Sequence, residues 1–314
     1  MAFDFAAVSV PFRMQPGLRK LATGAAQLTP TQPGAAALAE KLAVLTAHPG
    51  QALLQADGFD AAPALRAVCA QAVREHPDLF RWDGDAALEA RALGCSLRGT
   101  QVGGDGPAAL RATLAALPPE WRLAGLLCLA LEEDLAVIDG ATARIPWLAV
   151  CLPSHWAPAD KVGRHFAEVH APVADNQLLL TASEHLARLV TGTQRWERFV
   201  WTVTRQPALD AHPARAPALP WPAEADADTL AAAAYFRTER QTFVPLPAEG
   251  QAVFTIHVDV QPLARAIGTP AQARTLHDAL ASMSPAVLAY RNLAVARDRL
   301  LAWLAGRAAD RPSP

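Results

Sequence analysis

The densest group of chemically active side chains lies between residues 151 and 173, in the stretch CLPSHWAPADKVGRHFAEVHAPV. Imidazole is the usual nitrogen ligand of haem iron and of other transition metals. The spacing does not indicate a zinc site, because HExxH is absent and His165 and His170 stand five residues apart, off one helical face. A histidine just past a helix is more often a hydrogen-bonded structural residue, so both roles stay open. The polar and aromatic members of the group are His155, Trp156, Lys161, Arg164, His165, Glu168 and His170.

A second cluster, Arg237-Thr-Glu-Arg-Gln-Thr242, carries charges inside a strand-like run. In a strand, Arg237, Glu239 and Gln241 share one face, while Arg240 and its threonine neighbours share the other. One interpretation is a solvated face with cross-strand ion pairs. The other is a buried carboxylate and guanidinium directed at a ligand, with Glu239 holding an ammonium group. A serine hydrolase is poorly supported, because no GxSxG motif surrounds any serine.

The composition narrows the class of protein. The chain has 314 residues, of which 52% are hydrophobic and 18% charged, and its net charge is -2. This excludes a disordered chain, and no basic field would attract nucleic acid. No apolar run is long enough to span a membrane, and the N-terminal charges follow the apolar stretch, the reverse of a secretory signal. We therefore expect a cytoplasmic protein. The four cysteines show no CxxC pairing and are expected to be buried free thiols.

The hydrophobic pattern changes near residue 121. Before it, residues 35–48 and 60–73 predict helices among turns, and Gly103-Gly104-Asp105-Gly106 predicts a loop without phosphate-binding spacing. After it, two apolar runs joined by Asp139-Gly140 predict a hairpin. The further runs predict helices over 158–169 and 178–190, strands over 198–204, 235–243 and 252–258, a surface excursion over 207–228, and helices over 271–282 and 286–304.

This order of elements predicts an α+β fold. Two strands, a helical interval and three strands favour an antiparallel sheet of about five strands, because parallel α/β folds alternate strand and helix throughout. PAS-type ligand-binding domains have the same order, so the sheet is expected to be PAS-like, by analogy. The expected divisions are a helical N-terminal extension over 1–120, the PAS-like core over 121–265 and C-terminal helices over 266–314.

Five blocks of sequence resemble a known family, the haem-dependent oxidative N-demethylases and their relatives. They occur in family order from about residue 10 to residue 295. The blocks are PFRMQPGLRKL, CLPSHWAPADKVGRHFAEVHAPV, YFRTERQTFVPLP, AVFTIHVDVQPL and SPAVLAYRNLA.

The resemblance implies a PAS-like core that binds haem b. It also implies a monooxygenase that removes an N-methyl group from a small secondary amine with dioxygen. Electrons would come from a separate reductase, with flavin and [2Fe-2S] centres on partner proteins only. The alternative, from a different functional class, is a PAS-like haem or small-molecule binding or sensor protein without turnover.

The resemblance also assigns residues to the cofactor. His170 falls in the family's HAPV block and is the expected proximal iron ligand, with His165 and His185 as the alternatives. Lys161 and Arg164 match a K-x-G-R stretch and are expected to pair with haem propionates. The aromatic member of the cofactor site is Trp156.

The substrate residues come from the R-x-E-R-Q-T block. Glu239 is the expected partner of the substrate ammonium, and Arg240 is grouped with it in the catalytic set, while Arg237 is expected to contact the pocket or a propionate. The chain departs from the family at His257, where arginine usually follows the FTI triplet, and in the strand FVWTVTRQP. Both differences touch the expected ligand pocket.

Overall fold

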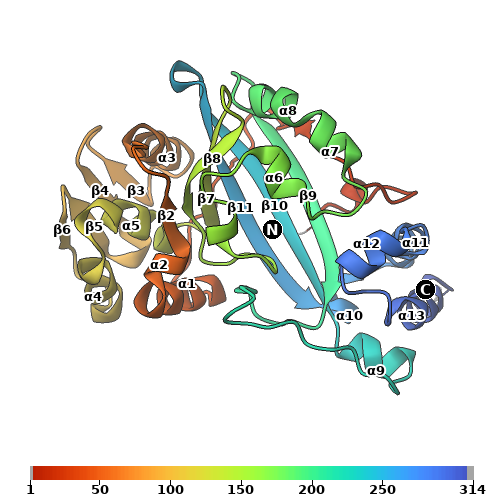
Figure 1. Cartoon of the computed structure of the whole chain (residues 1–314). Coiled ribbons are helices and arrows are strands. Elements are labelled where there is room, and N and C mark those ends of the chain that lie inside the picture. Colours follow the sequence, from red (N-terminus) through yellow and green to blue (C-terminus); the bar gives the residue numbers. More distant parts are fainter. Residues whose placement is uncertain (1–2, 310–314) are drawn as a thin grey trace.

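The computed structural model describes residues 3–309 and is built around a seven-stranded antiparallel sheet (Figure 1). The strand order is β1-β9-β10-β11-β7-β8-β2. The five central strands are those that the sequence predicts, and the two short outer strands extend the sheet to seven. Their bounds are β1 Arg19–Lys20, β2 Leu53–Gln55, β7 Glu133–Asp139, β8 Arg144–Ala149, β9 Trp196–Thr204, β10 Tyr235–Leu246 and β11 Gln251–Pro262.

The hairpin predicted at Asp139-Gly140 joins β7 to β8. The Oδ1 atom of Asp139 accepts a hydrogen bond of 2.8 Å from the backbone N–H of Thr142, which closes the turn. Gly140 packs so tightly that a Cβ atom there would lie 2.2 Å from Oγ1 of Thr191. A glycine is therefore required at this close approach between the hairpin and the end of a helix.

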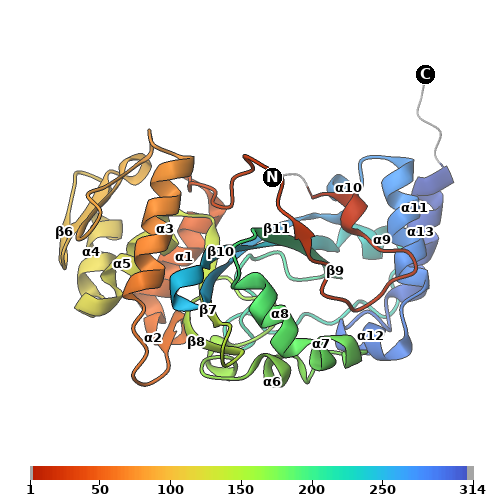
Figure 2. The same cartoon turned by 90° about the horizontal axis from the view of Figure 1, so that it is seen from above.

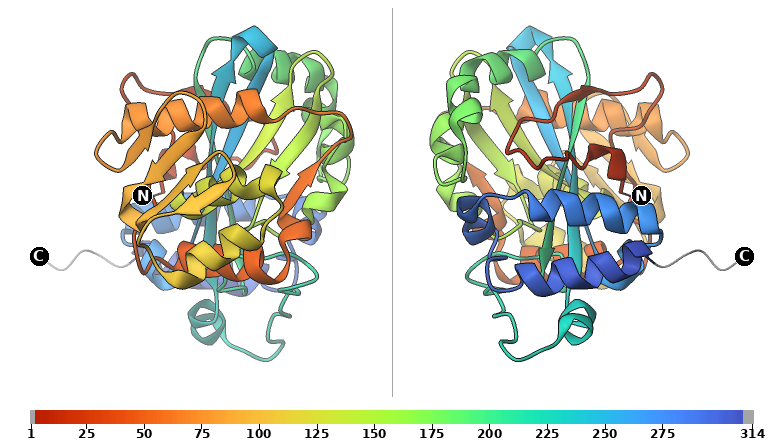
Figure 3. Two further views of the ribbon diagram at one scale, coloured as in Figure 1. Left: turned by 90° about the vertical axis from the view of Figure 1, so that its left-hand side faces the viewer. Right: turned by 90° about the vertical axis from the view of Figure 1, so that its right-hand side faces the viewer.

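The first 120 residues are not helices and turns alone, which corrects the sequence interpretation. The predicted helices are present as α1 (Ala36–Ala47) and α3 (Ala62–Glu75), but a separate four-stranded antiparallel sheet follows them. These strands span only three or four residues each, too short for an alternating pattern to stand out. The sheet, with α4 and α5 beside it, forms one end of the molecule (Figure 3). The elements are α2 Pro49–Ala52, β3 Phe80–Trp82, β4 Ala87–Ala90, β5 Cys95–Arg98, β6 Gln101–Gly103, α4 Ala108–Ala116 and α5 Arg122–Ala130.

The predicted helical interval lies across one face of the large sheet (Figure 2). It consists of α6 (Phe166–His170), α7 (Gln177–Thr181) and α8 (Ser183–Val190). The helix predicted over 158–169 is wrong for its first part, which is a 3-10 turn over Pro158–Asp160 followed by a non-helical segment up to α6. Apolar side chains of α6 and α8 pack on Ile138, Leu148 and Ala252 of the sheet. The opposite face is covered by α1, α3 and α5 at one end and by the C-terminal helices and the N-terminal segment at the other.

The C-terminal region forms two helices where the pattern over 286–304 predicts one. The first helix, α12 (Pro285–Tyr290), ends shortly before Asn292, whose φ is 54°. The second helix, α13 (Arg297–Ala309), begins after it. A left-handed residue ends a helix, and asparagine tolerates that conformation better than most residues. The predicted helix over 271–282 is α11 (Pro270–Ala281), which lies beside α13 (Figure 3). A short helix, α10 (Leu263–Ala266), leads into it from β11.

The excursion over 207–228 is buried where it begins, which corrects the expectation of a surface loop. Leu209, Ala211 and His212 are all at most 9% exposed. Asp210 forms an ion pair of 2.6 Å with Arg215, and Trp221 is buried further along. The remainder reaches outward before α9 (Ala227–Ala232).

The four cysteines are free and buried, as expected. Among residues 3–309, no helix has both the length and the apolar character that crossing a membrane requires.

A fully buried lysine fastens α1 to the start of β7. The Nζ atom of Lys41 donates to the carbonyl oxygens of Leu131 (3.1 Å) and Glu133 (2.7 Å) and lies 3.2 Å from Oδ1 of Asp134. The other carboxylate oxygen of Asp134 accepts a 2.6 Å bond from the backbone N–H of Leu152. Because every partner of the charge lies in the core, this pair depends on both of its members.

We expect Lys41→Ala to lower the free energy of unfolding by about 3–5 kcal/mol, because it leaves the Asp134 carboxylate buried without its counter-charge. Urea denaturation followed by circular dichroism measures this loss. The exposed Lys20 of β1 is the control, and Lys20→Ala should change stability by no more than about 0.5 kcal/mol. Equal effects of the two substitutions would contradict the assignment.

Candidate functional site

Four polar side chains share one face at the middle of the large sheet. Arg237, Glu239 and Gln241 alternate along β10, and Arg198 of β9 pairs in register with Gln241. This is the face on which α6 and α8 pack, because Phe243, two residues along β10 from Gln241, and its partner Phe254 on β11 belong to the apolar cluster that contains residues of both helices. A sheet face beneath helices is normally apolar, so these four side chains need partners.

Arg237 is 1% exposed and is surrounded by oxygen atoms. Its Nη1 donates to the carbonyl oxygen of Ala208 at 3.0 Å, and its Nη2 donates to those of Leu209 at 2.7 Å and Pro153 at 3.2 Å. Its Nε donates to Oγ of Ser154 at 2.8 Å. One guanidinium therefore ties the segment after β8 and the segment after β9 to β10.

Glu239 is 8% exposed and does not pair directly with Arg237 in the described part of the chain. Its Oε1 accepts a hydrogen bond from the hydroxyl of Ser154, and its Oε2 accepts one of 2.5 Å from Nε2 of Gln241. Ser154 thus stands between the arginine and the carboxylate. The solvated-face interpretation is wrong for this side of β10, because Arg237 and Glu239 are both buried.

Arg198 has fewer hydrogen-bond partners than the other charged side chains of this face, within the described residues. Its Nε is buried and has no hydrogen-bond partner among the described residues. Burial lowers the pKa of Arg198, and the negative charge of Glu239 partly opposes that shift. No motif in the sequence indicated a role for Arg198, although strand alternation from Arg198 through Val200 and Thr202 was a signal that these side chains share one face.

His170 is the last residue of α6, and one of its ring nitrogens has no hydrogen-bond partner among residues 3–309. Its Nδ1 lies 2.8 Å from the carbonyl oxygen of Phe166, which only accepts, so Nδ1 carries the proton and Nε2 keeps its lone pair. Burial, together with the positive charges of Arg198 and Lys161, lowers the pKa of His170 to about 4, although the hydrogen bond to Phe166 acts in the opposite direction. The imidazole is therefore neutral at neutral pH, as a metal ligand must be.

The other histidines expected near the cofactor have different surroundings. His165 begins α6: its Nδ1 accepts from the backbone N–H of Ala167 at 3.1 Å, and Glu168 bonds its backbone N–H in return, which forms a capping box. His185 is exposed on α8. His165 and His170 are both half-buried, but Nδ1 of His165 is engaged in the helix cap, whereas Nδ1 of His170 bonds a backbone carbonyl oxygen.

The residues expected around the haem edge are spread over the same interval. Lys161 is half-buried, and its Nζ donates to the carbonyl oxygen of Val169 at 3.1 Å. Arg164 is exposed, and Trp156 packs between two apolar clusters. His155 adopts a left-handed backbone conformation with φ of 64°, which is uncommon for a residue other than glycine.

Arg240 and His257 lie on the opposite face of the sheet, where the register pairs them. Arg240 forms an ion pair of 3.0 Å with Glu197 and donates to the carbonyl oxygen of Ala26 at 2.9 Å. Nδ1 of His257 lies 3.2 Å from Oε1 of Glu133, beside a hollow of about 580 Å³. The structure thus brings Arg237, Glu239 and His170 to one face and separates Arg240 and His257 from them.

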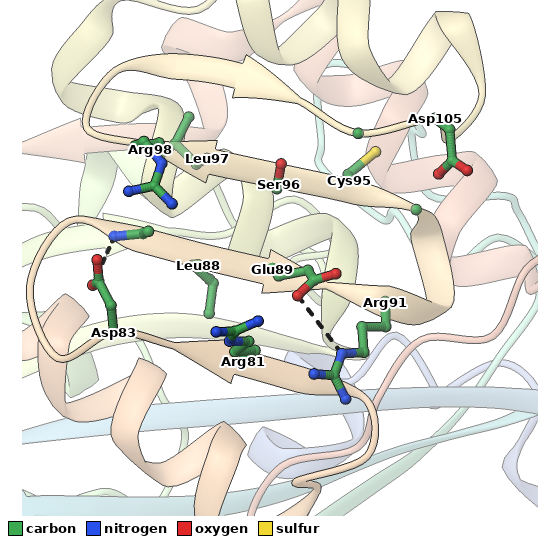
Figure 4. A pocket seen from close by; sticks show the side chains of 13 residues that line it. Arg81, Asp83, Leu88, Glu89, Arg91, Cys95, Ser96, Leu97, Arg98 and Asp105 are labelled. Atoms are coloured by element: carbon green, nitrogen blue, oxygen red, sulfur yellow. Dashed lines mark hydrogen bonds and ion pairs between the residues drawn. The ribbon is translucent and has the colours of Figure 1, made fainter.

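A second hollow, of about 390 Å³, lies on the small sheet far along the molecule from His170 (Figure 4). Its charges offset one another, since Glu89 pairs with Arg91 at 3.7 Å and Asp83 accepts three backbone N–H groups. No group of three or more histidine, cysteine, aspartate or glutamate side chains able to hold a metal ion occurs among residues 3–309. A haem differs from such a site, because its porphyrin supplies four nitrogen ligands and the protein needs to supply only an axial one.

Comparison with known proteins identifies the family. A model described as haem-dependent oxidative N-demethylase, alpha subunit-like, matches residues 35–301. Four of the five resembling blocks lie inside the match, and the first, at residues 11–21, precedes it. No curated protein matches the chain. The match spans most of the chain, and the predicted resemblance is confirmed: the protein belongs to the haem-dependent oxidative N-demethylase, alpha subunit-like family.

Proposed function

We propose that the protein is a haem-binding oxygenase subunit that removes an N-methyl group from a small secondary amine. The observation that carries this proposal is the neutral, half-buried His170, whose Nε2 has no hydrogen bond among the described residues, on the same face of the sheet as the buried carboxylate of Glu239. Family membership supports the haem-dependent kind of activity. The five central strands with the helices α6 to α8 are the proposed PAS-like core, within residues 121–265.

The side chains around His170 fit a haem b. The bond from Nδ1 to Phe166 orients the ring and raises the basicity of Nε2, the arrangement typical of metal-bound histidines. Arg198, with its unpartnered Nε, and Lys161 would meet the anionic propionates, with Arg164 and Trp156 at the edge of the site. When bound, the haem would supply the centre at which dioxygen is activated.

Glu239 is the proposed partner of the substrate ammonium. A secondary amine is cationic at neutral pH, and burying that charge without a counter-charge is costly. Ser154 and Gln241 each use one lone pair of the carboxylate, and an ionised carboxylate has about four acceptor positions, so two remain for the amine. Arg240 has no proposed contact with this substrate, because it points to the other face.

The proposed reaction depends on partners. Electrons would come from a separate cytoplasmic reductase with flavin and [2Fe-2S] centres, and dioxygen would be the oxidant. A binding or sensor protein is the competing class. Added reductase and NAD(P)H separate the two classes: an enzyme releases the N-methyl group as formaldehyde, whereas a sensor shows only the spectral response to ligands.

The purified protein should show a Soret absorption band, and His170→Ala should lose most of the haem or change its axial state, because the bond from Nδ1 to Phe166 leaves Nε2 of His170 as the proposed ligand nitrogen. Absorption spectra and pyridine haemochrome assays measure both effects. His185→Ala, at the exposed histidine of α8, is the control and should keep the parental spectrum. An unchanged spectrum in His170→Ala would remove His170 as the ligand.

Glu239→Gln should weaken dimethylamine-induced shifts of the haem spectrum by tenfold or more, about 1.4 kcal/mol or above, because the amide keeps the shape of the side chain but lacks its charge. Haem content should stay near that of the parent. Glu249→Gln, at a glutamate in the exposed turn after β10, is the matched control. Undiminished amine affinity in Glu239→Gln would show that the ammonium binds elsewhere.

A further inference from the structure

Arg237 and Glu239 lie two residues apart on the same face of β10, yet the hydroxyl of Ser154 lies between their charges. Arginine can only donate and an ionised carboxylate can only accept. The single hydroxyl proton of Ser154 is therefore directed at Glu239, while its oxygen accepts from Nε of Arg237 at 2.8 Å. Both bonds involve an ionised partner and are of the stronger kind.

Each of the three nitrogens of Arg237 has an acceptor other than Glu239. Its two terminal nitrogens donate to backbone carbonyl oxygens of residues 153, 208 and 209 at 2.7–3.2 Å, so Ser154 completes the set at Nε. If the hydroxyl were absent, Nε would lose its acceptor. The nearest charge on its own strand face is the carboxylate of Glu239, and a direct ion pair would then be favoured over an unpaired buried donor.

The backbone holds Ser154 in place from both sides. The N–H of Ala211 donates to the carbonyl oxygen of Pro153 at 3.0 Å, and the N–H of His155 donates to that of Ala211 at 3.0 Å. The left-handed φ of 64° at His155 turns the chain immediately after the serine. The position of the hydroxyl is therefore set by two segments that are remote in sequence and is not adjusted by a flexible loop.

We propose that Ser154 is a positioning residue that keeps Arg237 from neutralising Glu239, so that the carboxylate stays available to a cationic amine. This rests on the proposed function. The hydroxyl directs one oxygen of Glu239 and Gln241 directs the other, and the remaining acceptor positions face the substrate. Ser154 acts through Glu239 and not on the reacting atoms.

The test uses the full-length, haem-loaded protein and titration with dimethylamine, followed by the shift of the Soret band. Ser154→Ala should weaken amine affinity by tenfold or more while haem content stays within about twofold of the parent, and in turnover with a reductase KM should rise more than kcat falls. Ser154→Thr retains the hydroxyl and should restore affinity to within about threefold. Ser183→Ala, the same change at a buried serine of α8, is the matched control and should match the parent.

Ser154→Cys is the second loss variant, because a thiol has nearly the same shape but is a weak donor and acceptor. Should Ser154→Ala not fold, weakened amine binding in Ser154→Cys supports the proposal in its place. Parental amine affinity in a folded Ser154→Ala or Ser154→Cys variant overturns the role of Ser154 alone. A parent protein without a Soret band or without an amine response overturns the proposed function, and the role of Ser154 with it.

Discussion

The buried guanidinium of Arg237 holds together the candidate site. Arg237 lies on β10, next to the central strand of the sheet, where an unpaired charge would be very costly, and carbonyl oxygens from two separate segments accept its hydrogen bonds. Those segments follow β8 and β9, which stand on opposite sides of the sheet centre. The hydrogen bonds of Arg237 therefore hold the segments after β8 and β9 over the same face of the sheet. They also place Ser154 next to Glu239.

The two faces of the sheet differ in the side chains that they carry. One is packed with leucine, valine, tryptophan and phenylalanine under helices from both ends of the chain, and it also contains the ion pair of Arg240 with Glu197. The other combines apolar contacts to α6 and α8 with the polar group of Arg198, Arg237 and Glu239. The distinction follows from strand alternation, because residues 240 and 239 on one strand must point to opposite sides.

The sheet face that carries Glu239 combines a neutral imidazole, that of His170, with fixed charges. Desolvation keeps His170 uncharged, and the cation of Arg198 acts in the same direction. The same cation stands near the carboxylate of Glu239. This face therefore contains a neutral imidazole, a guanidinium whose Nε has no partner among the described residues, and a carboxylate; under the proposed function they would serve an anionic cofactor and a cationic substrate.

The sequence by itself determined the hairpin at Gly140, the three later strands, the helices between them and the shared face of Arg237 and Glu239, because periodicity and turn chemistry are local properties. Its blocks also identified the family. Only the tertiary structure decided that Ser154 separates those two charges, that the segment from Leu209 is buried, and that the final helix breaks at Asn292. Ser154 and Glu239 are 85 residues apart in the sequence. Their contact depends on the order of strands in the sheet and on the hydrogen bonds that Arg237 requires, and no local sequence pattern encodes either of these.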